Sequence, residues 1–283
     1  KTMPFKMENG KAYGPGILDM KGGIIMAYFS IKALLDLGLM PNKKIGIFFN
    51  SDEESGSFCS RDLILEKARQ YNNVLVMEPG VNDFHAIKTG RYGRGTYDII
   101  AYGKAAHSGS NPHLAINPLM ELARQLLRIE QWNSDTEGVT FAPTIINGGI
   151  AGTCMVPELA YFTMDVRYKT EEQVKTIHER IMKLEALTPG ARLEVQGKID
   201  KPVMFADNNL FQKAIQVAKQ YGLELKGITV GGGSDGNFTA AEGIPTLDGL
   251  GTTGEFLHNP LEYIHMDHVP YRTAMVSKLL QIL

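Results

Sequence analysis

The order of strands and helices in the middle of the chain is the feature that most narrows its fold. Apolar residues alternate in four segments there, which predicts strands, and recur at helical spacing in two others. The strands are predicted at 97–102, 139–146, 160–168 and 192–199, and the helices at 117–129 and 170–187. Along the chain they follow the order β-α-β-β-α-β of a split βαβ sandwich, so we expect an α+β domain of the ferredoxin-like type.

The segments on either side of this section carry a different pattern. Helical runs alternate there with short apolar strand patterns, which is typical of an α/β domain with a parallel sheet. The helices are predicted at 23–37, near 60–70, at 209–221 and at 270–283, and the strands at 43–50 and 73–77. We therefore expect residues 1–88 and 203–283 to form one α/β domain, with residues 89–202 inserted as the α+β domain.

Composition excludes several classes of protein. The 283 residues are enough for one large domain or two smaller ones. A formal net charge of -2 with mixed charges provides no basic stripe for nucleic acid, and no apolar run is long enough to span a membrane. The two cysteines, Cys59 and Cys154, form neither a metal-binding pair nor a disulfide framework. The composition indicates a globular protein and leaves its compartment open.

Three adjacent acids follow the predicted strand 43–50. Asp52, Glu53 and Glu54 repel one another, which costs stability unless a cation lies among them. In an open α/β sheet, ligands bind at the carboxyl ends of strands, where this run is expected. A solvated acidic loop is the simpler interpretation of the run taken alone, so other parts of the chain must decide.

Three further residues with ligand chemistry stand near the ends of predicted elements. Asp19 precedes the helix 23–37, Glu78 follows the strand 73–77, and His258 lies in a turn. Taken singly, they are interpreted as a helix cap, a solvated loop acid and a structural histidine. Together with the acidic run, they make a set of oxygen and nitrogen donors that suits two zinc ions.

Such a pair of ions also needs a division of labour among carboxylates. Two zinc ions are bridged by one carboxylate at a separation of roughly 3.5–4 Å and share the attacking hydroxide. Another carboxylate beside the ligands must accept the proton of that water. The adjacent Glu53 and Glu54 can divide this work, one as general base and the other as metal ligand.

These residues, with three further motifs, resemble a known family along nearly the whole chain. The motifs are Gly103-Lys104-Ala105-Ala106-His107-Ser108-Gly109, Asp165-Val166-Arg167-Tyr168 and Gly231-Gly232-Gly233-Ser234-Asp235. The chain resembles the zinc-dependent glutamate carboxypeptidases of the carboxypeptidase G group, in a superfamily with aminoacylases, acetylornithine deacetylase and succinyl-diaminopimelate desuccinylase. The resemblance implies a zinc-peptidase α/β domain, with a mixed sheet flanked by helices, and an inserted ferredoxin-like domain for dimerisation or as a lid.

The resemblance also implies a role for each metal-site residue. Asp19 matches the carboxylate that bridges two zinc ions, and Glu53 matches the general base. Glu54 and His258 match ligands of one zinc ion, and Glu78 matches a ligand of the other. Two zinc ions per intact subunit are expected, with a cis peptide bond directly after Asp19.

Substrate contacts are implied in the same way. His107 matches a histidine that reaches across a dimer interface to stabilise the oxyanion, which is among the larger contributions to acyl-transfer catalysis. Arg167 matches an arginine that binds the substrate carboxylate, and a planar guanidinium suits two-pronged recognition of that group. Gly232, Gly233 and Ser234 match a loop that lines the substrate pocket.

The chain departs from the family pattern in two respects. The His-x-Asp motif, which carries a further zinc ligand, is absent, and we expect it, with the first strands of the catalytic sheet, upstream of Lys1. Cys154 stands where family members commonly carry an asparagine that holds the substrate. A thiol is a poor substitute for a carboxamide, and a small buried apolar role for Cys154 is the alternative.

The predicted activity is hydrolysis of an amide bond next to a free carboxylate, which releases a C-terminal amino acid such as glutamate. The nucleophile is the hydroxide shared by two zinc ions, and the partners are a small peptide substrate and a second copy of the chain. An N-acyl-amino-acid amidohydrolase is one alternative. A catalytically inactive fragment that only dimerises is the other.

Overall fold

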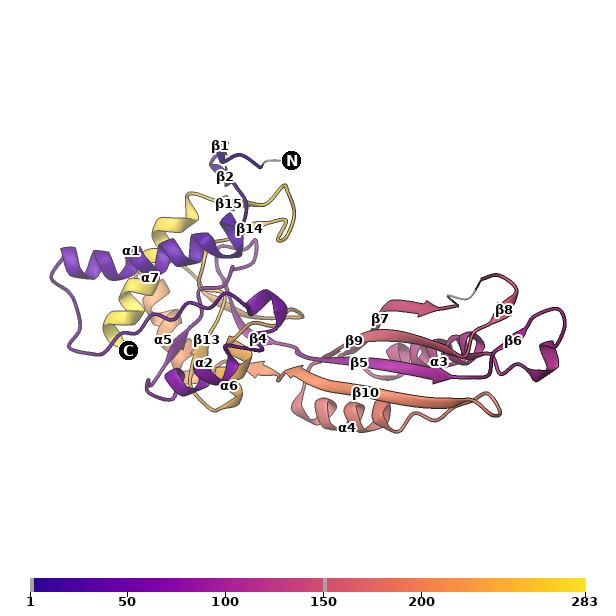
Figure 1. Ribbon diagram of the computed structural model, residues 1–283. Helices are drawn as coiled ribbons and strands as arrows, with labels where there is room; N and C mark the ends of the chain where they lie inside the picture. The colour runs from indigo at the N-terminus through magenta and orange to yellow at the C-terminus, as the bar shows by residue number, and fades with distance from the viewer. Residues whose placement is uncertain (1–2, 150–151) are drawn as a thin grey trace. The chain divides into compact units, whose positions relative to one another are not determined.

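The computed structural model describes residues 3–149 and 152–283, which fold into two compact units (Figure 1). One unit combines the chain up to Arg91 with Met204–Leu283, and the other is Tyr92–Val203. The second unit is therefore an insertion in the first. In the described part of the chain, no helix has the length and apolar character needed to cross a membrane.

The inserted unit is built on one four-stranded antiparallel sheet. Its strands lie in the order β10-β5-β9-β7, and two helices complete the predicted β-α-β-β-α-β sequence of elements, which is thereby confirmed. The elements are β5 (Gly93–Tyr102), α3 (Pro118–Asp135), β7 (Val139–Gly148), β9 (Leu159–Tyr168), α4 (Glu171–Met182) and β10 (Arg192–Lys201), with the short β6 (Ala106–His107), η3 (Pro112–Leu114) and β8 (Met155–Val156) between them.

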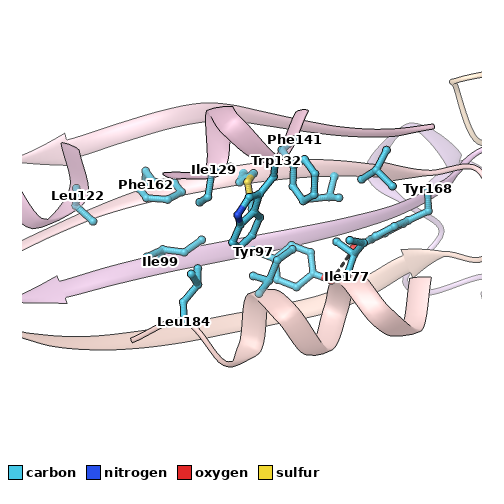
Figure 2. Packing of buried hydrophobic residues seen from close by; sticks show 14 of the residues in the cluster. Tyr97, Ile99, Leu122, Ile129, Trp132, Phe141, Phe162, Tyr168, Ile177 and Leu184 are labelled. Atoms are coloured by element: carbon cyan, nitrogen blue, oxygen red, sulfur yellow. Dashed lines mark hydrogen bonds between the residues drawn. The ribbon is translucent and has the colours of Figure 1, made fainter. Parts of the chain in front are cut away.

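Both helices share a single core with this sheet (Figure 2). Every second residue of β5 is buried, so Tyr97 and Ile99 face the helices with 0% exposure. Trp132 of α3 and Ile177 of α4 pack into the same cluster. Because both helices cover one face, the unit has one hydrophobic core of its own.

Helix α4 ends five residues before its predicted limit at residue 187. The buried carboxylate of Glu121 accepts the backbone N–H groups of Leu187 (3.0 Å) and Thr188 (2.6 Å). Pro189 follows at once and disfavours helical backbone in the residue before it. These tertiary hydrogen bonds and the proline keep residues 183–187 out of the helix.

Among its described residues the first unit has three sheets, one of which mixes parallel and antiparallel pairs. Strand β4 (Ala86–Arg91) pairs in parallel with β12 (Lys226–Val230) and antiparallel with β11 (Met204–Phe205). Two strands, β3 (Val74–Leu75) and β13 (Thr246–Leu247), form a parallel pair. The antiparallel sheet β1-β2-β15-β14 consists of β1 (Lys6–Glu8), β2 (Lys11–Tyr13), β15 (Tyr263–His265) and β14 (Gly254–Glu255).

Helices flank these sheets, as expected for a zinc-peptidase-like α/β domain. They are η1 (Ile17–Lys21), α1 (Gly22–Asp36), η2 (Glu53–Ser55), α2 (Arg61–Ala68), α5 (Asn208–Lys219), α6 (Gly236–Ala241) and α7 (His268–Ile282). Leu210 of α5 and Met275 of α7 pack with Ile87 of β4 and Leu247 of β13 in one core cluster.

The predicted strand 43–50 is wrong, and the strand predicted at 73–77 is shorter, at Val74–Leu75. No described strand pairs with residues 43–50. Ile47 and Phe49 are 48% and 62% exposed, so the segment is not buried either. A strand needs a hydrogen-bonded neighbour as well as an apolar sequence, and apolar composition alone does not supply one.

Candidate metal centre

Asp19, Glu54 and His258 converge on one point of the first unit. His258 Nε2 lies 2.9 Å from Asp19 Oδ2 and 3.4 Å from Glu54 Oε2. Each residue offers one ligand atom, and these atoms all lie within 4.8 Å of one another. Three of the residues singled out in the sequence are therefore neighbours, although more than 200 positions separate His258 from the other two.

Asp19 is positioned by a buried glutamate that the sequence did not distinguish. Glu262 is 4% exposed, and its carboxylate accepts the backbone N–H groups of Gly16 (3.0 Å), Leu18 (2.7 Å) and Asp19 (2.8 Å). The peptide bond between Asp19 and Met20 is cis, which confirms that prediction. No motif marks Glu262, because its partners are backbone groups far away in the sequence.

The acidic run divides into a structural residue and a residue that faces the cluster. The Asp52 carboxylate accepts the Ser60 hydroxyl (2.6 Å) and the backbone N–H groups of Cys59 (2.9 Å) and Ser60 (3.1 Å). The Ser60 hydroxyl, followed by the Cys59 N–H, lowers the pKa of Asp52 despite partial desolvation. Asp52 thus holds the turn that carries Glu53 and Glu54, and Glu54 contacts His258.

The electrostatics of this cluster favour a cation. Burial, and then the charge of Asp19, raise the pKa of Glu54. The hydrogen bond to Asp19 raises the pKa of His258, so the two carboxylates favour positive charge at this ring. A divalent cation bound here would neutralise the same carboxylates.

Glu78 lies in the same electrostatic environment but does not join the three-residue group. Burial raises the pKa of Glu78 to about 8, and Asp248, Asp19 and Glu53 add to the shift. Its carboxyl is therefore mostly protonated at pH 7 when no cation is near. Among the described residues, the ligand atoms within 4.8 Å of one another include those of Asp19, Glu54 and His258 but not that of Glu78.

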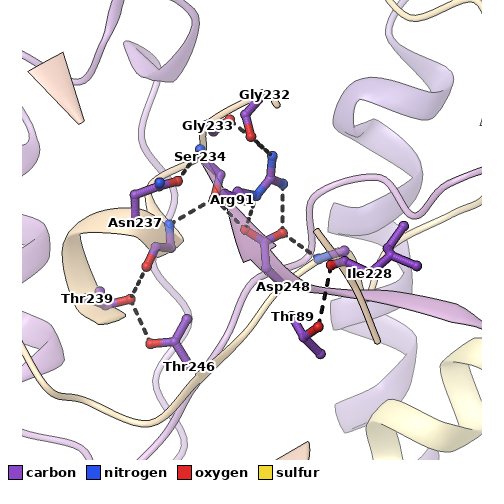
Figure 3. Close-up of polar contacts among 12 residues, drawn as sticks. Thr89, Arg91, Ile228, Gly232, Gly233, Ser234, Asn237, Thr239, Thr246 and Asp248 are labelled. Carbon is purple, nitrogen blue, oxygen red and sulfur yellow. Dashed lines mark hydrogen bonds and ion pairs between the residues drawn. The ribbon is translucent and has the colours of Figure 1, made fainter. Parts of the chain in front are cut away.

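A buried ion pair, also missed from the sequence, anchors the glycine-rich loop (Figure 3). Arg91 donates to Asp248 through Nε (2.7 Å) and Nη2 (2.8 Å), and through Nη1 to the carbonyls of Gly232 (3.0 Å) and Gly233 (3.1 Å). Ser234 Oγ bonds the same carboxylate, and Ser234 is 0% exposed. Gly232 is exposed, whereas the buried Ser234 side chain is hydrogen-bonded to Asp248.

His107 of β6 is exposed in the inserted unit. Its Nδ1 accepts the backbone N–H groups of Gly109 (3.1 Å) and Ser110 (3.1 Å). The neutral ring therefore carries its proton on Nε2, which can donate to an oxygen atom. Cys154 lies beside it, because its carbonyl accepts the N–H of Ser108 (2.8 Å). The Cys154 side chain is exposed, so the alternative of a buried apolar role is wrong.

Arg167 of β9 is held by an acidic neighbour. Its Nε donates to Asp165 Oδ1 (2.6 Å), and Arg94 Nε donates to Oδ2 of the same carboxylate (2.6 Å). The Arg167 side chain remains 29% exposed. The Asp165 carboxylate is therefore shared by two guanidinium groups.

Comparison with known proteins gives the family. The family model described as peptidase family M20/M25/M40 matches residues 1–282. The chain belongs to this peptidase family. It is 33% identical over 287 residues to carboxypeptidase G2 of Pseudomonas sp. (strain RS-16). The aligned region covers 98% of this chain and 68% of that protein.

Two further proteins are similar to nearly the whole chain. A succinyl-diaminopimelate desuccinylase of Nitrosococcus oceani is 28% identical over 301 residues, covering 100% of this chain and 78% of that protein. The crystal structure of a tripeptidase from Staphylococcus aureus has a TM-score of 0.80 at 20% identity, covering 99% of this chain and 76% of that chain. The chain therefore shares its fold with that tripeptidase.

As an M20 peptidase, the chain is a metal-dependent hydrolase. The donor set of two carboxylates and one imidazole fits a zinc ion, which binds oxygen and nitrogen ligands of this kind. The charge of Asp19 adds to the raised pKa of Glu54 and its hydrogen bond raises the pKa of His258, which is consistent with a cation among these groups.

Proposed function

We propose that this M20 peptidase hydrolyses an amide bond next to a free carboxylate and releases a C-terminal amino acid, with glutamate as the preferred product. The observation that carries the proposal is the convergence of Asp19, Glu54 and His258. The relationship to carboxypeptidase G2 supports the carboxypeptidase assignment.

The metal site would hold two zinc ions. Asp19, Glu54 and His258 would hold one, and Asp19 and Glu78 would contribute to the other, with Asp19 as the bridge. Zinc bound there would lower the pKa of a water molecule and polarise the scissile carbonyl. Burial, followed by the charges of Asp248, Asp19 and Glu53, raises the pKa of Glu78 to about 8, and a bound cation would offset these contributions.

Glu53 is the proposed general base. It stands next to Glu54 in the turn that Asp52 fixes, and its charge contributes to the raised pKa of Glu78. Glu53 would accept a proton from the attacking water and return it to the amine of the leaving amino acid, so the proton count balances over one turnover.

Two residues of the inserted unit and a loop of the first unit would contact the substrate. The Nε2 proton of His107, contributed by a second subunit of a homodimer, would donate to the oxyanion of the tetrahedral intermediate. The guanidinium of Arg167 would bind the free carboxylate. Gly232 and Gly233 would line the pocket, with Ser234 fixing their loop through Asp248.

Glu53→Gln tests the mechanism. We expect kcat to fall by a factor of about 10²–10⁴, the usual contribution of a positioned acid-base group, while the zinc content per chain stays that of the wild type. The matched control is Glu66→Gln, which makes the same change on an exposed residue of α2. Unchanged turnover in Glu53→Gln would contradict the assignment.

The second candidate function is deacylation of N-acyl amino acids. The 28% identity to a succinyl-diaminopimelate desuccinylase favours it. Product release from a folate-like glutamate conjugate, a dipeptide, an N-acetyl amino acid and an N-succinyl amino acid separates the two. Preference for the last two substrates would overturn the carboxypeptidase proposal in favour of deacylation. An inactive dimerising protein would bind no zinc and release nothing from any of them.

A further inference from the structure

A second cluster of metal-ligand side chains lies where β15 ends and α7 begins. His265, Asp267 and His268 each offer one ligand atom, and these atoms all lie within 4.8 Å of one another. The centroids of the two imidazole rings are 4.7 Å apart, and His268 Nε2 lies 3.9 Å from Asp267 Oδ1. The cluster shares no residue with Asp19, Glu54 and His258.

Hydrogen bonds fix the tautomer of His265. Glu255 accepts the Asn82 side-chain amide through Oε1 (2.6 Å) and the Tyr263 hydroxyl through Oε2 (2.7 Å). Since the amide nitrogen of Asn82 donates to Glu255, its oxygen is the atom that lies 2.9 Å from His265 Nε2. Nε2 must therefore carry the proton, which leaves the lone pair of Nδ1 for a ligand.

His268 is held in a similar manner. Its Nδ1 lies 2.6 Å from Thr253 Oγ1, and the Phe84 ring stacks on the imidazole at a centroid distance of 4.5 Å. The other nitrogen, Nε2, faces Asp267. Orientation of a histidine by a hydrogen bond at the nitrogen away from the ligand is the usual arrangement in protein metal sites.

We propose that His265, Asp267 and His268 bind a divalent transition-metal ion such as zinc at a second site. Two imidazole nitrogens and one carboxylate oxygen form a set of three protein ligands found in zinc sites, with water completing the shell. Magnesium and calcium prefer shells made only of oxygen, so the two imidazoles select against them.

The geometry requires only a small closure. Two ligand atoms at about 2.0–2.1 Å from a tetrahedral zinc ion lie about 3.3 Å apart. The 3.9 Å between His268 Nε2 and Asp267 Oδ1 must therefore shrink by about 0.6 Å, and a separation at the 4.8 Å limit by about 1.5 Å. Asp267 is 76% exposed, so its side chain can move without disturbing the core. Its carboxylate also offsets the positive end of the α7 dipole, which would otherwise disfavour a cation there.

An ion at this site would join β15 to the first turn of α7. That helix carries Met275 and Leu279 into the core. It also carries the fully buried Arg272, whose guanidinium donates to the carbonyls of Gly251 (2.8 Å) and Ala86 (3.2 Å). The site is therefore a structural one, and ligation should stabilise the fold.

Cobalt(II) titration tests the site, because the visible absorption of cobalt reports nitrogen ligation and coordination number. The starting protein for the titration is a variant with Glu54→Gln and His258→Ala, which remove two exposed ligands of the first cluster. We expect about one equivalent of cobalt to bind with visible bands, and His265→Ala with His268→Ala to abolish them. In the protein with Glu54→Gln and His258→Ala, zinc at 100-fold excess over its Kd should raise Tm by roughly 5–10 °C. When His265→Ala and His268→Ala are added, zinc should leave Tm unchanged.

Two single changes keep the test falsifiable if the double histidine change unfolds the protein. Asp267→Asn affects an exposed side chain and should weaken cobalt binding at least tenfold. Asn82→Ala removes the positioning bond to His265 and should weaken it 10–100-fold. His113→Ala, an exposed histidine in η3, is the matched control and should change nothing. Failure of the starting protein to bind cobalt, or affinity unaffected by Asp267→Asn, would overturn the proposal.

Because these readouts are taken after the first cluster has been removed, they do not depend on activity. Loss of the second site would leave the proposed hydrolase untouched, and an inactive protein would leave the second site untouched.

Discussion

At the scale of single residues, the acidic run shows how neighbouring carboxylates take different tasks. Asp52 is occupied by Ser60 and the N–H of Cys59, whereas Glu54 turns toward His258. The sequence presents them as equivalent acids. Their roles differ because each carboxylate meets different partners, and Asp52 is needed to hold the turn on which Glu54 depends.

Glu262→Gln should weaken metal binding without touching a proposed ligand. Both carboxylate oxygens of Glu262 accept N–H groups, and an amide would place an N–H donor against another donor at one of them. We expect zinc affinity to fall 10–100-fold, as for other groups that orient ligands. Competition with a chromophoric chelator measures it, and Glu66→Gln is the control. An affinity equal to that of the control would refute the positioning role.

Asp248→Asn should strongly destabilise the protein. The change leaves the buried guanidinium of Arg91 without its counter-ion, and breaking one side of a buried pair costs about 3–5 kcal/mol. Urea unfolding measures the loss. The control is Glu242→Gln, which breaks the exposed pair with Arg69 and should cost less than about 1 kcal/mol. Equal losses in the two variants would be incompatible with this account.

The same carboxyl predicts a pH dependence. Burial acts to raise the pKa of Asp248, but the charge and hydrogen bonds of Arg91 outweigh it and lower the pKa. Ionised Asp248 therefore stabilises the fold above the unfolded pKa of about 4, and this contribution is lost as the pH falls through the lower folded pKa. The free energy of unfolding, measured from pH 7 downward, should fall in the wild type as Asp248 becomes protonated. It should fall less in Asp248→Asn, which has no carboxyl at this position.

At the scale of elements, local signals decide where a helix begins better than where it ends. Helix α4 starts with a capping box, in which the Thr170 side chain accepts from the Gln173 N–H and Gln173 bonds back to Thr170. Its end depends on Glu121 of α3, whose carboxylate accepts the backbone N–H groups of Leu187 and Thr188. The start is encoded in adjacent residues, and the end depends on another helix.

Two threonine changes on α4 should have opposite effects. Thr170→Ala removes the cap and should destabilise the protein by about 1 kcal/mol. Thr176→Ala makes the same chemical change inside the helix, where the hydroxyl bonds the carbonyls of Glu172 (2.9 Å) and Gln173 (3.5 Å), and alanine should be favoured by a few tenths of a kcal/mol. Thermal unfolding of both variants compares them, and a loss of the same size in each would speak against the cap.

At the scale of the whole molecule, the inserted unit is organised as a domain. Tyr92–Val203 has its own sheet and its own core, which includes Tyr97, Phe162 and Trp132. Every residue of this core cluster lies within the unit, so we expect the unit to fold when produced alone. Its proposed role in dimerisation can be tested on the same fragment.

The fragment 92–203 should unfold cooperatively in urea and have the mass of a dimer by light scattering. Cooperative unfolding follows from the single core. The dimer follows from the proposed role of His107 in a second subunit. A monomeric mass at high concentration would contradict the dimer proposal, and a non-cooperative transition would contradict independent folding.

The sequence by itself determined the element order of the inserted unit and the residue types of the candidate metal centre. Alternation along β5 and the cap of α4 are local, since they depend on residues within one element. The family motif was also readable, and it led to Asp19, Glu54 and His258, which the structure brings together.

Only the tertiary structure decided what depends on distant partners. The apolar segment 43–50 is not a strand, because no described strand pairs with it. Glu262 and the pair of Arg91 with Asp248 carry no sequence signal, because their partners are backbone groups and side chains far along the chain. Hydrogen bonding and burial arise between elements, so these contributions become visible only when the chain is folded.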